Sequence, residues 1–364
     1  MTQARLVIGE RYEGDPLKQE EVDSLGSRLG RNWFNGLMKR RVEDLKFRVP
    51  SQLEQSRITV KADDVRSFYA SLGSLIEEYR IHPALLANVD ETMLKTLRKW
   101  RKVVSRLEDP DPFIAEDEKV THITLLPTVF ANGDSLQSLV ILPLVHIPND
   151  LEDDLLGSFH WIGQSSGWIN RETFHRFMRE VYFPAIEERR LRYNLKDRWS
   201  LLLLDGHSSR ENAELLEECL SHKIMIRTYV SHASHMCQVL DRGIFLEFKT
   251  DLTSRKSTAA YNNRVEWRNQ TLRHAAKAMA VACEKMVVIK AWRESGCWPV
   301  DDKKALTKKN FPDLDLPPEE SPLLEKRKRS GFRISNQLLT SQANIQALRE
   351  QQANASSRKV RRKT

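Results

Sequence analysis

The chain has 364 residues, with 58 lysines and arginines against 50 aspartates and glutamates, which gives a formal net charge of +8. This length is ample for a packed core, in one large domain or two ordinary ones, and the charge is typical of proteins with a polyanionic partner such as nucleic acid. No apolar run approaches the roughly 18 residues that a membrane-spanning helix needs, and the N-terminus lacks a signal-peptide core. The composition therefore excludes a membrane protein and predicts a soluble, intracellular one.

The cysteines lie far apart in the sequence and form no CxxC pair. This spacing is typical neither of a disulfide framework nor of a zinc knuckle. We therefore expect reduced thiols, buried in the core of the protein, at all four positions: Cys219, Cys237, Cys283 and Cys297.

The first 45 residues are polar and contain one dense patch, GRNWFNGLMKRR, at positions 30–41. Trp33, Phe34 and Leu37 follow the spacing of one helix stripe. Four basic side chains surround this stripe: Arg31, Lys39, Arg40 and Arg41. Residues 46–75 are expected to form a linker and the first part of a helix over 62–80, because apolar residues recur there at spacings of three and four.

Short apolar runs alternate with helical patterns between residues 76 and 305. The runs HITLLPTVF and LQSLVILPLV flank an Asn-Gly pair and predict a hairpin, and a helix is expected after Asn170 as its N-cap. WSLLLLDGHSS and IMIRTYVS indicate strands on either side of a helix, and from about residue 239 the pattern is helical until Gly296 and Pro299 stop it. This succession predicts a mixed α/β sheet with helices on both faces, in which the apolar run 201–204 is a central parallel strand.

Residues 306–364 are polar and charged, with LPPEESP near their start. We expect a disordered basic tail without a packed core, containing at most one helix near 335–352. Two basic clusters, 326–329 and 358–363, resemble nuclear localisation signals. They could equally hold a DNA backbone or remain solvated.

Two of the predicted strands stop on an aspartate, Asp90 after ALLANV and Asp205 after LLLL. If these strands are parallel neighbours, both carboxylates emerge at one edge of the sheet, where ligands of such sheets bind. Asp241 follows the helical spacing of Phe245 and Phe248, which predicts that it shares their buried face. Grouped carboxylates repel one another unless a cation joins them, and hard oxygen ligands suit Mg²⁺ or Mn²⁺. The pattern favours metal-dependent phosphoryl chemistry, although an aspartate at a strand end is more often a turn or cap residue.

Two other groups of residues could bind metal. His232 and His235 have HxxH spacing near Cys237, but no second pair completes a zinc site. The run NDLEDDLLG at 149–157 offers Glu152, Asp153 and Asp154 as rival ligands. Because no buried strand positions that run, we expect it to be a solvated loop.

The segments NVDET, LLLLDGHSSR and SHASHMCQVLDRGIF, in this order, resemble the DDE superfamily endonuclease domain of pogo and Tigger transposases, which are relatives of centromere protein B. KVTHITLLPTVFANGD, QSSGWINRETF and AWRESGCWP are similar to that family's second strand, mid-domain helix start and final helix. The resemblance covers roughly residues 76–300. The patch GRNWFNGLMKRR is similar to the end of the family's centromere-protein-B-type helix-turn-helix.

The resemblance implies an RNase H-like domain over 76–305, preceded by a partial helix-turn-helix DNA-binding segment over 1–45. It assigns the catalytic triad to Asp90, Asp205 and Asp241, which would bind two Mg²⁺ or Mn²⁺ ions. Family members cut DNA at transposon ends and join the freed 3′ hydroxyl to a target. The resemblance further implies a nuclear protein with DNA as its partner, and it allows a homo-oligomer on DNA. The expected DNA-binding residues are Arg31, Lys39, Arg40, Arg41, His207 and His235.

Two alternatives to a transposase-type nuclease stay open on sequence alone. A domesticated or decayed relative would keep the fold and bind DNA without catalysis, as centromere protein B does. An unrelated metal phosphohydrolase is less favoured, because NVDET lacks the DxD spacing of the haloacid-dehalogenase nucleophile motif.

Overall fold

The computed structural model describes residues 60–94, 123–206, 212–256, 264–307, 310–311 and 336–361. The chain divides into two compact units, Met1–Glu54 and Gln55–Thr364, and all the described residues belong to the second. Several predictions fall outside the described residues. They are the N-terminal DNA-binding segment with Arg31, Lys39, Arg40 and Arg41, the residue His207, and the basic cluster 326–329.

The centre of the described unit is a four-stranded sheet with the order β4-β1-β7-β8. β7 pairs in parallel with β1 on one side and with β8 on the other, and β4 is antiparallel to β1. All five residues of β7 are fully buried, which confirms the predicted central parallel strand. The bounds are β1 Leu86–Val89, β4 Thr128–Phe130, β7 Ser200–Leu204 and β8 Ile224–Thr228.

A second sheet has the order β2-β3-β5-β6 and continues the first. Only Asp90 and Glu91 separate β1 from β2, and only Pro127 separates β3 from β4, so one pair of chain segments runs through both sheets. β3 and β5 are antiparallel, which confirms the predicted hairpin. The bounds are β2 Thr92–Leu94, β3 Ile123–Leu126, β5 Leu139–Leu142 and β6 His160–Gly163.

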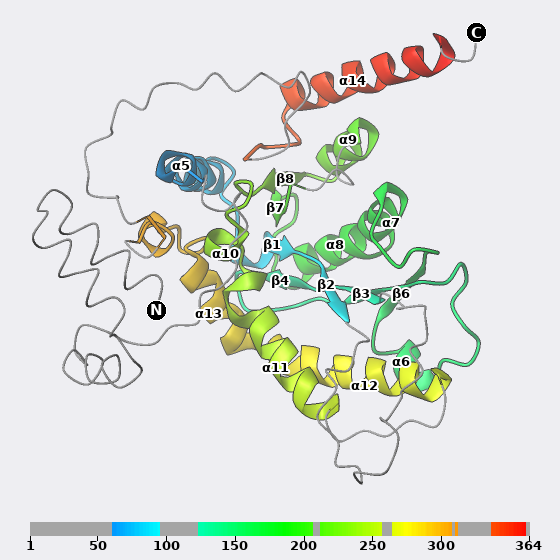
Figure 1. Ribbon diagram of the computed structural model, residues 1–364. Coiled ribbons are helices and arrows are strands. Elements are labelled where there is room, and N and C mark those ends of the chain that lie inside the picture. The colour runs from blue at the N-terminus through cyan, green and yellow to red at the C-terminus, as the bar shows by residue number, and fades with distance from the viewer. Residues whose placement is uncertain are drawn as a thin grey trace, which may run out of the picture. The chain divides into compact units, whose positions relative to one another are not determined.

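Alternate residues of the central strands face two separate hydrophobic cores. Leu86, Leu201 and Leu203 lie in one core, whereas Ala87 and Leu202 lie in the other. Helices cover both faces, so the expected mixed α/β sheet flanked by helices is confirmed (Figure 1). The first core is covered by α5 (Ala62–Glu78), α10 (Ser234–Cys237), α11 (Phe245–Lys256), α12 (Arg264–Ala282) and α13 (Lys285–Ser295), and the second by α7 (Arg171–Arg176), α8 (Phe183–Arg192) and α9 (Ala213–Ser221).

The folded core includes residues before 76, the expected start of the domain. The helix predicted over 62–80 is α5, and it packs Phe68, Leu72 and Ile76 into the first core. This helix is therefore part of the same folded unit as the sheet.

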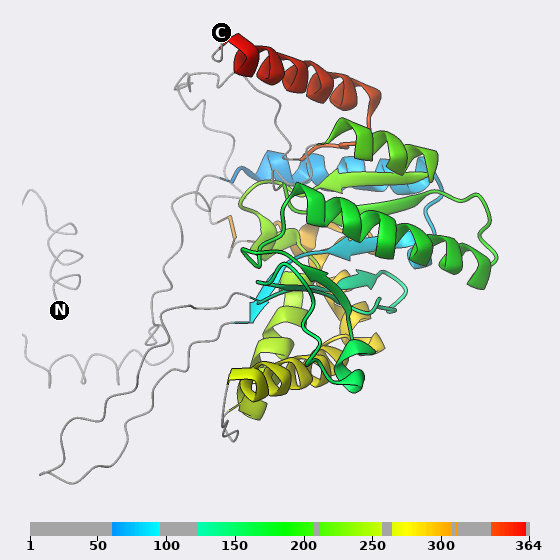
Figure 2. The same ribbon diagram turned by 90° about the vertical axis from the view of Figure 1, so that its right-hand side faces the viewer.

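The single helix that we expected near 335–352 is present, and the segment 336–341 before it is also ordered, which we did not predict. Leu339 donates its backbone N–H to the Ile226 carbonyl at 2.8 Å, and the Thr228 N–H donates to the Gln337 carbonyl at 2.9 Å, so this segment covers the edge of β8. α14 (Gln342–Arg361) then lies beside α9, as both views show (Figures 1 and 2). A strand edge has open hydrogen-bonding groups, and a segment with only a few buried apolar residues is enough to cover it.

Two glycines lie where the sequence predicts a turn and the end of a helix. Gly133, in the predicted Asn-Gly turn, has a φ of 94°, and a Cβ there would lie 2.7 Å from the Lys285 side chain. Gly296 has a φ of 70° and ends α13, as predicted, and a Cβ there would lie 2.2 Å from the Asp301 carbonyl oxygen. Only glycine satisfies both the backbone conformation and the space at these positions.

The cysteines also agree with expectation. All four are free thiols; Cys219, Cys237 and Cys297 are buried, and Cys283 is half-buried. Among the helices of the described ranges, none combines the length and the hydropathy that crossing a lipid bilayer requires.

The predicted N-cap of the helix that begins at Arg171 is confirmed and provides a stability test. Asn170 accepts a hydrogen bond from the Thr173 N–H at 2.9 Å, while the Thr173 hydroxyl accepts one from the Asn170 N–H at 2.7 Å. Asn170→Ala should lower the free energy of unfolding by about 1 kcal/mol, because it leaves a first-turn donor unsatisfied. Urea unfolding measures this change. Asn170→Asp keeps the acceptor and should cost much less; an equal loss in both variants would contradict the capping role.

Candidate active site

The register of the two central strands brings the first two predicted site residues together. Leu86 pairs with Leu201 and Asn88 with Leu203 across the parallel ladder of β1 and β7. Two residues further along both strands, this register sets Asp90 opposite Asp205. Neighbouring strands lie only about 4.8 Å apart, so the two aspartates emerge side by side at the carboxyl edge of the sheet.

The alternation of side chains also gives the direction in which these aspartates face. Every second residue of a strand faces the same side of the sheet. Asp90 is therefore on the same side as Leu86, and Asp205 is on the same side as Leu201 and Leu203. These three leucines lie in the first core. This is the side of the sheet on which α10 and α11 lie (Figure 1). Asp241 is in the chain segment between those two helices.

The prediction that Asp241 shares the buried face of Phe245 and Phe248 is wrong. Phe245 and Phe248 are buried, but Asp241 is exposed. The helical turn η4 (Leu240–Ile244) contains two non-helical residues, Arg242 with φ −89° and ψ 45° and Gly243 with φ 119° and ψ −36°. The chain therefore kinks before α11, and the spacing of a continuous helix does not extend back to Asp241.

The electrostatics of Asp90 indicate that the three aspartates are near one another. Burial raises the pKa of the Asp90 carboxyl well above its usual value, and the negative charges of Asp205 and Asp241 raise that pKa further. A hydrogen bond from the Glu91 backbone lowers the Asp90 pKa but does not outweigh these effects. Carboxylates that repel one another in this way are the environment that a divalent cation stabilises.

Metal ligation by these residues stays a prediction. Within the described ranges, no three His, Cys, Asp or Glu side chains are gathered closely enough to hold a metal ion. The donor set nevertheless fits the expected ions, because three carboxylates supply the hard oxygen atoms that Mg²⁺ and Mn²⁺ prefer.

The alternative metal sites receive no support. Burial raises the pKa of the Cys237 thiol to about 11, which disfavours the thiolate that zinc requires. Of the rival carboxylates, Asp154 forms an ion pair with Arg273 of α12 at 2.9 Å, and Glu152 also pairs with Arg273. Instead of the solvated loop that we expected, Asp153–Leu156 forms the short helix α6, which these ion pairs attach to α12.

One residue near the aspartates was not singled out from the sequence. Asn88 is fully buried at the centre of β1, and its side chain forms hydrogen bonds with the backbone of both β7 and η4. The signal that could have identified it is a polar residue inside the apolar run ALLANV, since a buried amide requires hydrogen-bond partners. His235, expected to bind DNA, lies on α10 before Asp241 and is half-buried.

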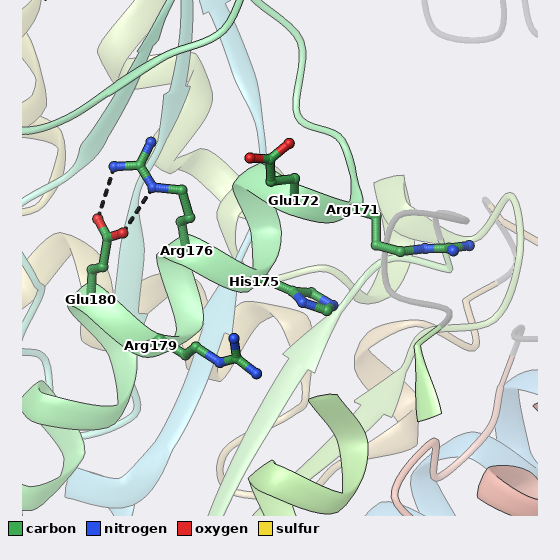
Figure 3. Close-up of a pocket in the computed structure, with 6 residues that line it drawn as sticks. All are labelled: Arg171, Glu172, His175, Arg176, Arg179 and Glu180. Carbon is green, nitrogen blue, oxygen red and sulfur yellow. Dashed lines mark hydrogen bonds and ion pairs between the residues drawn. The ribbon is translucent and has the colours of Figure 1, made fainter. Parts of the chain in front are cut away.

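An open pocket of about 470 Å³ lies elsewhere, on α7 and the following turn η2 (Phe177–Tyr182). Figure 3 shows its lining side chains, with Arg176 paired to Glu180. Arg179 pairs with Glu218 of α9 at 2.7 Å, so two of its cations are already neutralised. None of the six residues that line it is an aspartate, and the pocket is therefore separate from the candidate site.

Comparison with known proteins gives one family match. Residues 119–294 match the family model of the DDE superfamily endonuclease. This range contains Asp205 and Asp241 but begins after Asp90, so the assignment of Asp90 depends on the register of β1 and β7. No curated protein matches the chain.

Among solved structures, the chain is similar to a pre-cleavage Mos1 transpososome, with 11% identity over 77% of this chain and 78% of that one and a TM-score of 0.40. It is similar to the Mos1 mariner paired end complex with Mn, with 10% identity, coverage of 76% and 77%, and a TM-score of 0.40. For the catalytic domain of Mos1 mariner transposase the identity is 11%, the coverage 65% and 98%, and the TM-score 0.34.

Proposed function

We propose that this protein is a transposase-type DNA endonuclease and strand transferase whose metal-binding carboxylates are Asp90, Asp205 and Asp241. The observation that carries the proposal is the register of β1 and β7, which sets Asp90 beside Asp205 at the carboxyl edge of the sheet. The raised pKa of Asp90, with contributions from both other aspartates, supports the inclusion of Asp241. The family match over residues 119–294 supports the reaction class.

The three carboxylates have distinct structural settings in this proposal. Asp90 and Asp205 extend from adjacent buried strands, which hold them rigidly, whereas Asp241 lies in an exposed kinked segment. Two bound Mg²⁺ or Mn²⁺ ions would supply Lewis-acid activation of water or a 3′ hydroxyl and would stabilise the charge that develops on the phosphate. The protein would supply the negative charge that holds the ions.

The proposal also covers the protein's family relationship, its binding partner and its location in the cell. The motif order supports a pogo- or Tigger-type relationship with a centromere-protein-B-type helix-turn-helix at 1–45. The net charge of +8 supports DNA as the partner, bound mainly through its backbone and therefore sensitive to salt. The basic clusters at 326–329 and 358–363 support a nuclear location, and a homo-oligomer on DNA is part of the same proposal.

A domesticated or decayed DNA-binding protein without catalysis is the second candidate. It is favoured by one observation: in the described part of the chain, no three potential ligands are gathered closely enough to hold a metal ion. The two candidates differ in a measurable way, because both bind DNA and only one cuts it.

Removing the metal tests the proposal directly. The purified full chain should nick supercoiled plasmid in Mg²⁺ or Mn²⁺ and should stop when a chelator is added, because the carboxylates cannot stabilise a phosphate transition state without cations. DNA binding, measured by fluorescence anisotropy, should persist in the chelator and weaken as salt rises. Binding without nicking in any divalent metal would support the domesticated protein instead, and nicking that continues in the chelator would refute metal-dependent catalysis.

A further inference from the structure

Asn88 connects the three chain segments that carry the aspartates. Its Nδ2 donates to the carbonyl oxygen of Leu203 at 3.0 Å, and its Oδ1 accepts from the backbone N–H of Leu240 at 3.1 Å. Asn88 itself lies two residues before Asp90, Leu203 lies two residues before Asp205, and Leu240 immediately precedes Asp241.

The chemistry of the two partners fixes the orientation of the Asn88 amide. A backbone N–H can only donate, so the atom that faces Leu240 is the oxygen, and a carbonyl can only accept, so the atom that faces Leu203 is the nitrogen. An aspartate has nearly the same shape as asparagine but cannot donate to Leu203 when ionised. Position 88 therefore requires both a donor and an acceptor on one short side chain.

The contact with Leu240 has a second structural role. Leu240 begins η4, and the first N–H groups of a helical turn have no acceptor within the turn itself. Asn88 provides that acceptor from the neighbouring strand, 152 positions earlier in the sequence. Because Asn88 is fully buried, water cannot replace this hydrogen bond.

We infer that Asn88 is a positioning residue, which holds the segment carrying Asp241 against the strand pair carrying Asp90 and Asp205. The part of this inference that concerns metal binding and catalysis rests on the proposed function. Groups that orient metal ligands without touching the metal typically change metal affinity or activity by about 10–100-fold when they are removed. We expect an effect of that size from Asn88.

The experiment compares Asn88→Ala with Ser200→Ala in the full chain. Ser200 is a matched control, because it is also fully buried and its hydroxyl donates to the Leu85 carbonyl at 2.8 Å. This bond joins the start of β7 to the residue before β1, at the end remote from the aspartates. Both variants should lose stability. Only Asn88→Ala should weaken Mn²⁺ binding, by about 10–100-fold as measured from the electron paramagnetic resonance signal of free Mn²⁺.

A second measurement separates this inference from the proposed function. Hydrogen exchange at the Leu240 amide should accelerate at least tenfold in Asn88→Ala and stay within about twofold of wild type in Ser200→Ala, because only the first change removes the acceptor. If wild type binds no Mn²⁺, the proposed function fails, and the exchange rates still decide whether Asn88 holds this segment. Unchanged Leu240 exchange in folded Asn88→Ala, or equal loss of Mn²⁺ affinity in Ser200→Ala, would overturn the inference.

Discussion

Asp205→Asn is expected to lower metal-dependent nicking of DNA by at least 10²–10³-fold, the order of loss seen when one electrostatic element of an active site is removed. Asp205 follows a strand whose residues are all fully buried and lies opposite Asp90 in the strand register. Asparagine has nearly the same shape but lacks the negative charge that holds the cations. DNA binding should remain or strengthen slightly, because metal-free carboxylates repel phosphate groups.

The control for this variant lies at the other end of the same strand. Asp197 precedes β7, is largely exposed and pairs with Lys223 at 3.2 Å. Asp197→Asn removes the same charge without touching the sheet edge that carries Asp90, so nicking should stay at the wild-type rate. The assay is the initial rate of plasmid nicking in Mg²⁺ and Mn²⁺, with folding checked by circular dichroism. Equal nicking by wild type and Asp205→Asn would place the activity elsewhere or identify a contaminant.

Arg189→Ala is expected to destabilise the fold by about 3 kcal/mol, near the lower end of the range for breaking a buried ion pair. Arg189 is only 3% exposed and lies on α8. Its Nε donates to the Ala84 carbonyl at 2.7 Å, two residues before β1, and its Nη2 donates to Asp134 at 3.0 Å. Its guanidinium carbon lies 3.5 Å from the centre of the Phe130 ring. One side chain thus joins α8 to the start of β1 and to the turn after β4.

The remaining contacts of Asp134 explain why the expected loss of stability is near the lower end of the range for a buried ion pair. Burial alone would raise the Asp134 pKa, but hydrogen bonds from Tyr193 and Asn132 and the charge of Arg189 lower it below its usual value. Without Arg189 the carboxylate keeps Tyr193 and Asn132 and its partial access to solvent. The larger loss comes from the Ala84 carbonyl, which is left buried without its partner, and from the space above Phe130.

Urea unfolding compares the loss of unfolding free energy in Arg189→Ala with that in the control variant Arg192→Ala. Arg192 lies on the same helix but forms an exposed pair with Glu188 at 2.7 Å, which contributes only about 0.3–0.5 kcal/mol. Arg189→Lys should fall between the two variants, since it keeps the charge but cannot reproduce all of the hydrogen bonds to Ala84, Asn132 and Asp134. A loss in Arg189→Ala no larger than in Arg192→Ala would mean that the buried contacts do not contribute to stability.

The central sheet and two of the three aspartates could be predicted from the sequence, because local patterns determine them. Apolar runs as continuous as 201–204 have few alternatives to a buried strand, and an aspartate at the end of each run has a fixed position once the strands are parallel. The direction of Asp241 could not be predicted in the same way. Helical spacing assumes regular backbone, and the φ of 119° at Gly243 interrupts it.

Contacts between distant parts of the chain were the other source of error. Asn88 and Leu240 are 152 positions apart, and Arg189 and Ala84 are 105 apart, so no local window contains both partners. The segment 336–348 looks polar because Leu339, Ile345 and Leu348 are few among many polar residues. Its order depends on the edge of β8, which composition does not reveal.

The covering of β8 by the segment 336–340 has a consequence for synthesis on the ribosome. Thr228 and its partner Gln337 lie 109 positions apart, and chain elongation adds about 5–20 residues per second, so roughly 5–20 s pass between the appearance of the two. During that interval the apolar strand β8 emerges with its backbone groups unpaired on one side. Such an edge pairs readily with other nascent chains. A chaperone that binds extended apolar segments would therefore be most needed between the synthesis of β8 and that of α14.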